Sequence, residues 1–168
     1  MHLGLEALKI LNDLPPQVIV RYHPRKHIAL VKQLRDMEEN LVSLTEQQIR
    51  PLVHTQGESR KMTDEEYITE LVPDGKDLWL LTDGITLFGA MLMKTVNEYE
   101  HTISLNMLIV SEEHRGQGYG KKLIDYAKTV YKDRYKYIIL STTTKNPAGK
   151  LYAREGFTDY MRTMVAKI

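Results

Sequence analysis

The run from His114 to Lys122 constrains this chain more than any other segment. It reads His-Arg-Gly-Gln-Gly-Tyr-Gly-Lys-Lys, with alternate glycines at 116, 118 and 120. Residues 104–110 before it are typical of a strand, and residues 121–131 after it are typical of a helix. Glycine lets the backbone pass close to a ligand, and a helix start offers unpaired N–H groups and a positive dipole end. We therefore predict a phosphate or pyrophosphate site at this junction.

Spacing separates this run from two common phosphate-binding motifs. A dinucleotide fingerprint needs glycines at the first, third and sixth positions, but the sixth residue counted from Gly116 is Lys121. A P-loop needs Gly, four residues, and then Gly-Lys followed by Ser or Thr. Here Arg115 occupies the first glycine position and Lys122 the last. Neither motif is present, and a glycine-rich turn without a ligand stays open as the alternative.

The pattern that fits is Arg-x-x-Gly-x-Gly at Arg115, Gly118 and Gly120, which resembles the pyrophosphate loop of the GNAT superfamily of acyl-CoA-dependent N-acyltransferases. A second segment, from Asn146 to Phe157, resembles the last helix of that family, with Asn, Ala, Leu-Tyr and Gly-Phe in order. Two motifs in order are more specific than either alone. The similarity is strong over residues 79–157 and only topological before them.

The resemblance implies an α/β (α+β) fold with a mixed, mostly antiparallel central sheet flanked by helices. We expect residues 1–16 to form an extra N-terminal amphipathic helix packed on the domain, and residues 17–168 to form a single GNAT-like domain. The spacing of apolar residues and breakers predicts strands at 17–22, 77–81, 85–96, 101–110, 137–141 and 157–167, helices at 24–44, 63–72, 121–131 and after 146, and a mobile connection at 45–62. The crossover between 101–110 and 137–141 should make that pair of strands parallel.

The resemblance also implies which residues hold acetyl-CoA. Backbone groups of Leu108 and Val110 should face the pantetheine arm, although both side chains are compatible with a purely structural core. The pyrophosphate should meet Arg115, Gly116, Gln117, Gly118, Tyr119, Gly120, Lys121 and Lys122. Asn146 falls near the family's asparagine, and it fits a helix cap ahead of Pro147 equally well.

For catalysis, the family commonly uses a tyrosine as general acid at the place that Tyr152 occupies here. A phenol is protonated at neutral pH and can donate its proton to a leaving thiolate. The alternative is a helical tyrosine that only packs its ring. Some family members carry a basic carboxylate on the strand before the loop, but residues 104–106 read Ser-Leu-Asn. We therefore name Glu100 and His101 as candidate bases acting through water, and an enzyme that accepts already neutral amines needs neither.

Composition leaves the acceptor open. The 168 residues carry a net charge of +1 and no cysteine. The lack of cysteine excludes disulfides, a cysteine nucleophile and thiolate metal sites, and we expect no metal site. No membrane span or signal peptide is expected, and we predict a cytoplasmic protein.

Seven acids between Glu58 and Asp77 favour a cationic small molecule, a lysine or an N-terminal amine as acceptor. The sequence leaves open a nucleic-acid-linked amine as the acceptor. It also leaves open a non-catalytic acyl-CoA-binding function, and a homodimer as the oligomeric state.

Overall fold

The structure is a computed structural model that describes residues 16–49, 62–73, 76–142 and 146–161. The predicted N-terminal helix therefore lies outside the described residues, except for its last position. Most of the predicted connection at 45–62 also lies outside them. The sequence predicted that the helix beginning at residue 24 ends at Leu44. In the structure this helix, α2 (Pro24–Ile49), ends five residues later.

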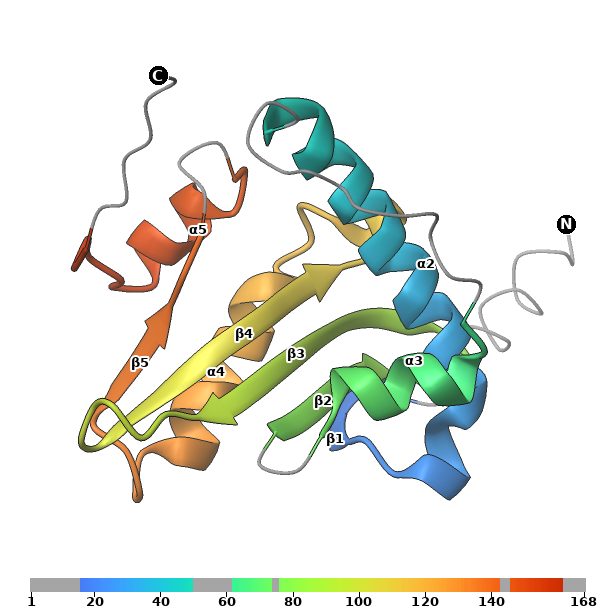
Figure 1. Ribbon diagram of the computed structural model, residues 1–168, viewed down its shortest axis with the longest axis horizontal. Coiled ribbons are helices and arrows are strands. Elements are labelled where there is room, and N and C mark those ends of the chain that lie inside the picture. Colours follow the sequence, from blue (N-terminus) through green and yellow to red (C-terminus); the bar gives the residue numbers. More distant parts are fainter. Residues whose placement is uncertain (1–15, 50–61, 74–75, 143–145, 162–168) are drawn as a thin grey trace, which may run out of the picture.

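Five strands form one sheet in the order in which they follow along the chain (Figure 1). They are β1 (Val18–Arg21), β2 (Lys76–Thr82), β3 (Leu87–Thr95), β4 (Thr102–Val110) and β5 (Tyr137–Leu140). The first three pairings are antiparallel, and β4 pairs with β5 in parallel. This confirms the mixed, mostly antiparallel sheet.

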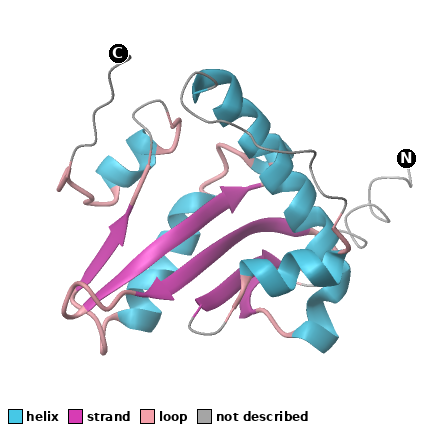
Figure 2. Ribbon diagram, in the orientation of Figure 1, coloured by secondary structure: helices cyan, strands magenta, loops and turns pink. Residues whose placement is uncertain are grey.

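Helices cover both faces of the sheet (Figure 2). Helices α2 and α3 (Asp64–Leu71) lie on one face, where Leu30, Val31 and Leu34 of α2 pack with β2 and β3 residues. Helix α4 (Tyr119–Tyr131) makes the crossover on the other face and packs there together with the short helix α5 (Gly149–Arg154). The sheet is thus the middle layer between two separate apolar clusters.

A local signal sets the start of α3, as expected. Thr63 caps α3, accepting a hydrogen bond from the Glu66 N–H at 3.2 Å, while the Glu66 carboxylate accepts one from the Thr63 N–H at 2.9 Å. This reciprocal pair is a capping box, and it explains why the acidic first turn begins a helix.

The predicted last strand does not begin at Phe157, because residues 157–161 have no strand structure; the rest of it lies outside the described residues.

A β-bulge interrupts β4 in its middle. Leu105 and Met107 pair with consecutive residues of β3, which leaves Asn106 as an extra residue on β4. The insertion shifts the alternation of side chains, so Leu105 before it and Leu108 after it both pack in the α4-side cluster. The bulge therefore redirects the last part of β4, just before the chain enters the glycine-rich loop.

Candidate active site

The gap between β4 and β5 opens beyond the bulge. The parallel pairing runs only from Thr102 with Tyr137 to Leu105 with Leu140. Figure 1 shows the two strands diverging from there, with the remaining half of β4 on one side and α5 on the other. Within the described residues, the β5-side edge of Asn106–Val110 has no strand partner.

The loop after β4 ends at a helix without a side-chain cap. A 3-10 turn, η1 (Glu112–His114), follows β4, and Gly116 and Gly118 then adopt positive φ angles of 76° and 83°. Gly118 is the N-cap of α4 and provides no capping side chain. The Lys122 N–H bonds to the Gly118 carbonyl at 3.0 Å, so the N–H groups before it point out of the first turn. An uncapped helix start of this kind is the geometry on which the predicted anion site depends.

The third glycine of the run has a different role from the other two. Gly120 needs no positive φ, but a Cβ there would lie 2.7 Å from Leu151 Cδ2 of α5. Gly89 on β3 is similarly crowded, because its Cβ would lie 2.9 Å from the Ile109 carbonyl and 3.2 Å from Leu123 Cδ1. The two glycines therefore let α4 approach α5 and the sheet closely. The sequence does not identify Gly89 as important, because a single glycine inside an apolar strand belongs to no motif.

Side chains beneath η1 hold the loop in place. Ser111 Oγ and His114 Nδ1 lie 2.6 Å apart, and the Ser111 N–H donates to the Phe88 carbonyl at 2.9 Å. The His114 ring packs edge-on against Phe88 at 4.8 Å between centroids. The Tyr119 hydroxyl, at the start of α4, accepts a hydrogen bond from Gln17 at 3.0 Å. These contacts give His114 a structural place under the loop.

The three cations of the loop differ in their partners. Arg115 Nε donates to the Val110 carbonyl at 3.3 Å, and its guanidinium has no carboxylate partner in the described part of the chain. Lys122 likewise makes no ion pair among those residues. Lys121 instead pairs with Asp125 at 2.8 Å and Glu155 at 3.4 Å. Arg115 and Lys122 are therefore the cations most available to a phosphate.

Tyr152 lies in the buried part of α5. Its side chain is 9% exposed and packs in the same apolar cluster as Leu108 of β4. The ring meets Phe157 edge-on at 5.8 Å between centroids. The Tyr152 hydroxyl makes no hydrogen bond to any residue that the structure describes. Burial raises the pKa of the Tyr152 phenol, so the group keeps its proton at neutral pH.

Asn146 is engaged locally, just before α5. Its Oδ1 accepts a hydrogen bond from the Ala148 N–H at 2.9 Å, and its Nδ2 donates to Thr142 Oγ1 at 2.7 Å. The side chain thus bridges the end of β5 and the turn that enters α5. The bond to Ala148 is an Asx turn ahead of α5, and the N-cap of the helix is Ala148 without a side-chain cap, so Asn146 is not the helix cap considered from the sequence.

Glu100 and His101 lie at the other end of β4. They form the turn before Thr102, whereas the glycine-rich loop follows Val110, about 30 Å away along a nine-residue strand. His101 has a positive φ of 54°, and its carbonyl accepts hydrogen bonds from the N–H groups of Lys136 and Tyr137. The structure brings Tyr152 near the loop, but it does not bring either candidate base there.

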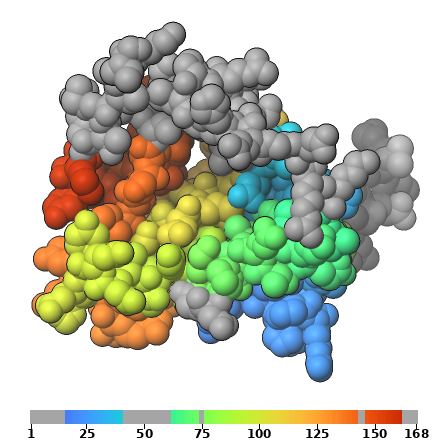
Figure 3. All heavy atoms as spheres, in the orientation of Figure 1, coloured from blue at the N-terminus to red at the C-terminus, as the bar shows by residue number. Residues whose placement is uncertain are grey.

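The acids between Glu58 and Asp77 are largely committed to structure. Asp64 pairs with Arg35 at 2.8 Å, Glu66 completes the capping box, and Asp77 accepts a hydrogen bond from the Tyr131 hydroxyl at 2.7 Å. Figure 3 shows α3 and α5 on opposite sides of β3 and β4 on this face. The remaining described acids of the segment are Glu65 and Glu70, and Glu58 and Asp74 lie outside the described residues.

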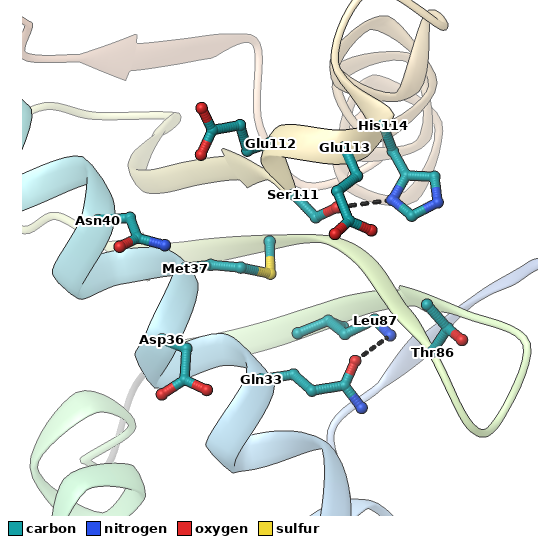
Figure 4. A pocket seen from close by; sticks show the side chains of 10 residues that line it. All are labelled: Gln33, Asp36, Met37, Asn40, Thr86, Leu87, Ser111, Glu112, Glu113 and His114. Atoms are coloured by element: carbon teal, nitrogen blue, oxygen red, sulfur yellow. Dashed lines mark hydrogen bonds between the residues drawn. The ribbon is translucent and has the colours of Figure 1, made fainter.

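A hollow of about 380 Å³ lies between α2 and η1 (Figure 4). The Gln33 amide closes one side of it, accepting from the Leu87 N–H at 2.9 Å and donating to the Ile85 carbonyl at 2.8 Å. It has a polar and acidic lining that includes Asp36, Asn40, Ser111, Glu112, Glu113 and His114.

The described residues hold no cluster suited to a metal ion, and none of their helices could span a membrane.

Solved structures share this architecture. A tetramutant of the BH1408 protein from Bacillus halodurans superposes with a TM-score of 0.71 at 12% identity, over 90% of this chain and 99% of that one. A ribosomal-protein-alanine N-acetyltransferase from Brucella melitensis biovar Abortus 2308 gives 0.63 at 16%, over 91% and 100%. An aminoglycoside acetyltransferase from an uncultured soil metagenomic sample gives 0.58 at 13%, over 90% and 94%. At such identities the similarity shows the fold.

Sequence comparison defines the family. No curated protein sequence matched the chain. The family model of the acetyltransferase (GNAT) domain matches residues 74–159, more than half of the 168 residues, and this span includes the sheet from β2 to β5, the glycine-rich loop and α5. The chain therefore belongs to the GNAT acetyltransferase family.

Proposed function

We propose that this protein moves an acetyl group from acetyl-CoA to a primary amine by direct attack. One observation carries the proposal. The unpaired half of β4 leads straight into the uncapped, glycine-rich start of α4, and the buried phenol of Tyr152 packs in the same cluster as Leu108. A strand edge, an anion site and a proton donor are the three parts that such a transfer needs.

The residues present suit the cofactor. The open edge at Leu108 and Val110 offers backbone groups to a pantetheine arm, and the exposed loop offers N–H groups from Gly116 to Lys121 to a pyrophosphate. Arg115 and Lys122 add positive charge without carboxylate partners in the described chain. Asn146 would contribute through the turn that it holds ahead of α5.

Bound acetyl-CoA would supply the thioester carbonyl for attack. Tyr152 would hold a proton on its hydroxyl oxygen and donate it to the departing thiolate, and its raised pKa keeps that proton available at neutral pH. Glu100 and His101 lie at the opposite end of β4 from the glycine-rich loop. We therefore propose that the acceptor reacts as an amine that is already neutral, without a strong base.

Two acceptor classes fit a GNAT site. The structural relatives include one named for a ribosomal protein and one named for aminoglycosides, so protein amines and small cationic amines are both carried forward. A nucleic-acid-linked amine is the alternative, and the net charge of +1 does not favour a polyanionic partner. A binding module without turnover is the other alternative, against which the buried phenol is the main argument.

Tyr152→Phe tests the proton donor, because it keeps the ring and removes only the hydroxyl. We expect turnover with a panel of amines to fall by roughly 10²–10⁴-fold, while acetyl-CoA binding in calorimetry stays close to wild type. Unchanged turnover would make Tyr152 a packing residue. Absence of turnover in the wild-type protein, with acetyl-CoA bound, would favour the binding module.

Gly118→Ala tests the cofactor loop, and Gly84→Ala is its matched control. Both glycines have positive φ angles, 83° and 96°, and a Cβ at either position would meet no atom within 4 Å. Both substitutions should therefore cost similar backbone strain, of order 1 kcal/mol. Only Gly118→Ala should weaken acetyl-CoA binding in calorimetry. Equal acetyl-CoA affinity in the two variants would remove the pyrophosphate assignment.

Charge reversal of α3 tests the cationic acceptor. Glu65 and Glu70 are suitable, whereas Glu66 is not, because its carboxylate completes the capping box. Glu65→Lys with Glu70→Lys should raise the KM for a cationic amine, leave that for acetyl-CoA unchanged, and have less effect at high salt. Improved use of an RNA-linked amine by this variant would favour the polyanionic acceptor instead.

A further inference from the structure

Helix α5 carries Tyr152 but is too short to fix its own position. It spans six residues, Gly149–Arg154, and a helix of that length is not stable by itself. Its orientation must therefore come from its contacts with the rest of the protein. Two of these contacts reach α4, the helix whose start forms the glycine-rich loop.

The first contact is apolar and lies one residue before Tyr152. Leu151 packs into the space left by the missing Cβ of Gly120, where an added Cβ would be 2.7 Å from Leu151 Cδ2. Real Cβ contacts are essentially never shorter than 3.0 Å, so even alanine would force the end of the leucine side chain to move. By contrast, Gly149 at the start of α5 has no atom within 4 Å of its Cβ position.

The second contact is ionic and lies three residues after Tyr152. The Glu155 side chain is only 9% exposed, and Lys121 Nζ and Lys128 Nζ lie 3.4 Å and 3.7 Å from its Oε2. Lys128 Nζ also donates to the Glu155 carbonyl at 2.7 Å. Glu155 thus meets two lysines that lie about two turns apart on α4, and it does so at the C-terminal end of α5.

We propose that Leu151 and Glu155 are positioning residues that lock α5 onto α4 and thereby place Tyr152 relative to the cofactor loop. The inference rests on the proposed transferase function. It gives α4 two tasks, since its first turn receives the cofactor phosphates while Gly120, Lys121 and Lys128 hold the helix that carries the acid. A shift of the α5 helix then misplaces the proton donor without removing it.

Gly120→Ala tests the apolar contact, with Gly149→Ala as the matched control in open space. We expect Gly120→Ala to lower kcat by roughly 10–100-fold, because a displacement of about 1 Å has effects of that size, and to change the KM for the amine much less. Gly149→Ala should keep the wild-type kcat. Adding Leu151→Ala to Gly120→Ala removes the clashing atom and should restore part of the lost rate.

A result without rescue would contradict the proposal. If Gly120→Ala keeps the wild-type kcat, the contact does not position Tyr152. The kcat of the double variant can also be compared with that of Gly120→Ala. If the added Leu151→Ala lowers kcat by the same factor as it does in the wild-type protein, the two residues act independently, and the proposal is also wrong.

Glu155→Gln tests the ionic contact. It removes the charge and keeps the side-chain shape, and the bond from Lys128 to the Glu155 carbonyl remains, so we expect a smaller loss of kcat, about tenfold. Asp133→Asn is the control, because this acid at the end of α4 makes no ion pair among the described residues. Equal kcat values for the two variants would limit the lock to Leu151.

A spectroscopic measurement separates this inference from the proposed function. Tyrosine labelled with ¹³C at Cζ reports phenol ionisation, and Tyr152→Phe identifies the resonance among the 10 tyrosines. Burial raises the Tyr152 pKa, so releasing α5 in Gly120→Ala should lower it toward the ordinary value near 10. An unshifted Tyr152 titration would overturn the lock even if the protein shows no acetyl transfer, whereas a shifted titration without turnover would overturn only the function.

Discussion

The two faces of the sheet are held by different kinds of contact. On the α4 face, two glycines bring backbone and helix close together: Gly89 lies against Leu123 and the Ile109 carbonyl, and Gly120 lies against Leu151. Much of this face's packing is aromatic, and Tyr131, at the far end of α4, donates to Asp77 while accepting a hydrogen bond from Trp79.

On the α2 face, polar side chains join the two helices above an aliphatic cluster. Arg35 pairs with Asp64 at 2.8 Å and donates to the Met62 carbonyl at 2.9 Å. The Tyr67 hydroxyl of α3 donates to the Glu38 carboxylate of α2, and burial together with this bond raises the Tyr67 pKa far above its usual range. These groups lie away from the glycine-rich loop and from Tyr152.

This difference explains why only one face has a recognisable motif. Close approach of backbones requires glycine at set positions, and a ligand loop adds further requirements at fixed spacing. A polar bond between two helices can be made by many residue pairs. The α4 face is therefore constrained by geometry, while the α2 face is constrained mainly by burial.

The largest effect should come from core truncation, applied equally to both faces. Leu34 of α2 is 1% exposed and Leu123 of α4 is 0% exposed, so Leu34→Ala and Leu123→Ala should each lower the free energy of unfolding by roughly 2–5 kcal/mol in urea titrations. Only Leu123→Ala should also weaken acetyl-CoA binding. Equal loss of binding in both variants would mean that the faces are not functionally distinct.

Tyr67→Phe should have the next largest effect. It leaves the Glu38 carboxylate without its donor between α2 and α3, which should lower the free energy of unfolding by roughly 1.5–3 kcal/mol. Tyr126→Phe is the control on the other face, since the Tyr126 hydroxyl makes no hydrogen bond within the described residues. A loss for Tyr67→Phe no greater than that for the control would show that the polar contact contributes little.

Gly89→Ala probes the backbone approach on the α4 face. The added methyl group would meet the Ile109 carbonyl at 2.9 Å, so we expect a loss of about 1–3 kcal/mol in the free energy of unfolding. Ala90→Gly at the next position of β3 is a useful comparison, because it removes a methyl group that faces α2. If alanine at 89 is stabilising, the close contact is not a requirement of the fold.

The smallest effect should be a pH dependence at the start of α2. Burial and the neighbouring His23 and Lys26 lower the pKa of His27, whose Nδ1 accepts a hydrogen bond from the His23 N–H at 2.9 Å. The unfolded chain then binds this proton more readily, so stability should be full above about pH 6.5 and decrease as pH falls through the folded pKa. Urea unfolding of His27→Gln should show a weaker dependence over that range.

Local patterns in the sequence predicted the elements that depend on nearby residues. The start of α3, the strand–loop–helix at the glycine run and the parallel crossover are each set within a few residues or by chain connectivity, and the structure confirms them. The family was recognisable for the same reason, because its motifs are short and have fixed spacing.

Only the tertiary structure decided which residues meet. Gly120 could be assigned to a ligand from its spacing, but its missing Cβ faces Leu151 of another helix. Lys121 belongs to the predicted pyrophosphate loop, but the structure places the Glu155 carboxylate, 34 positions away, beside its Nζ. Glu100 and His101 directly precede the strand that leads to the site, yet they lie at its opposite end. Sequence patterns report local conformation and charge, whereas distances between elements depend on packing that brings remote segments together.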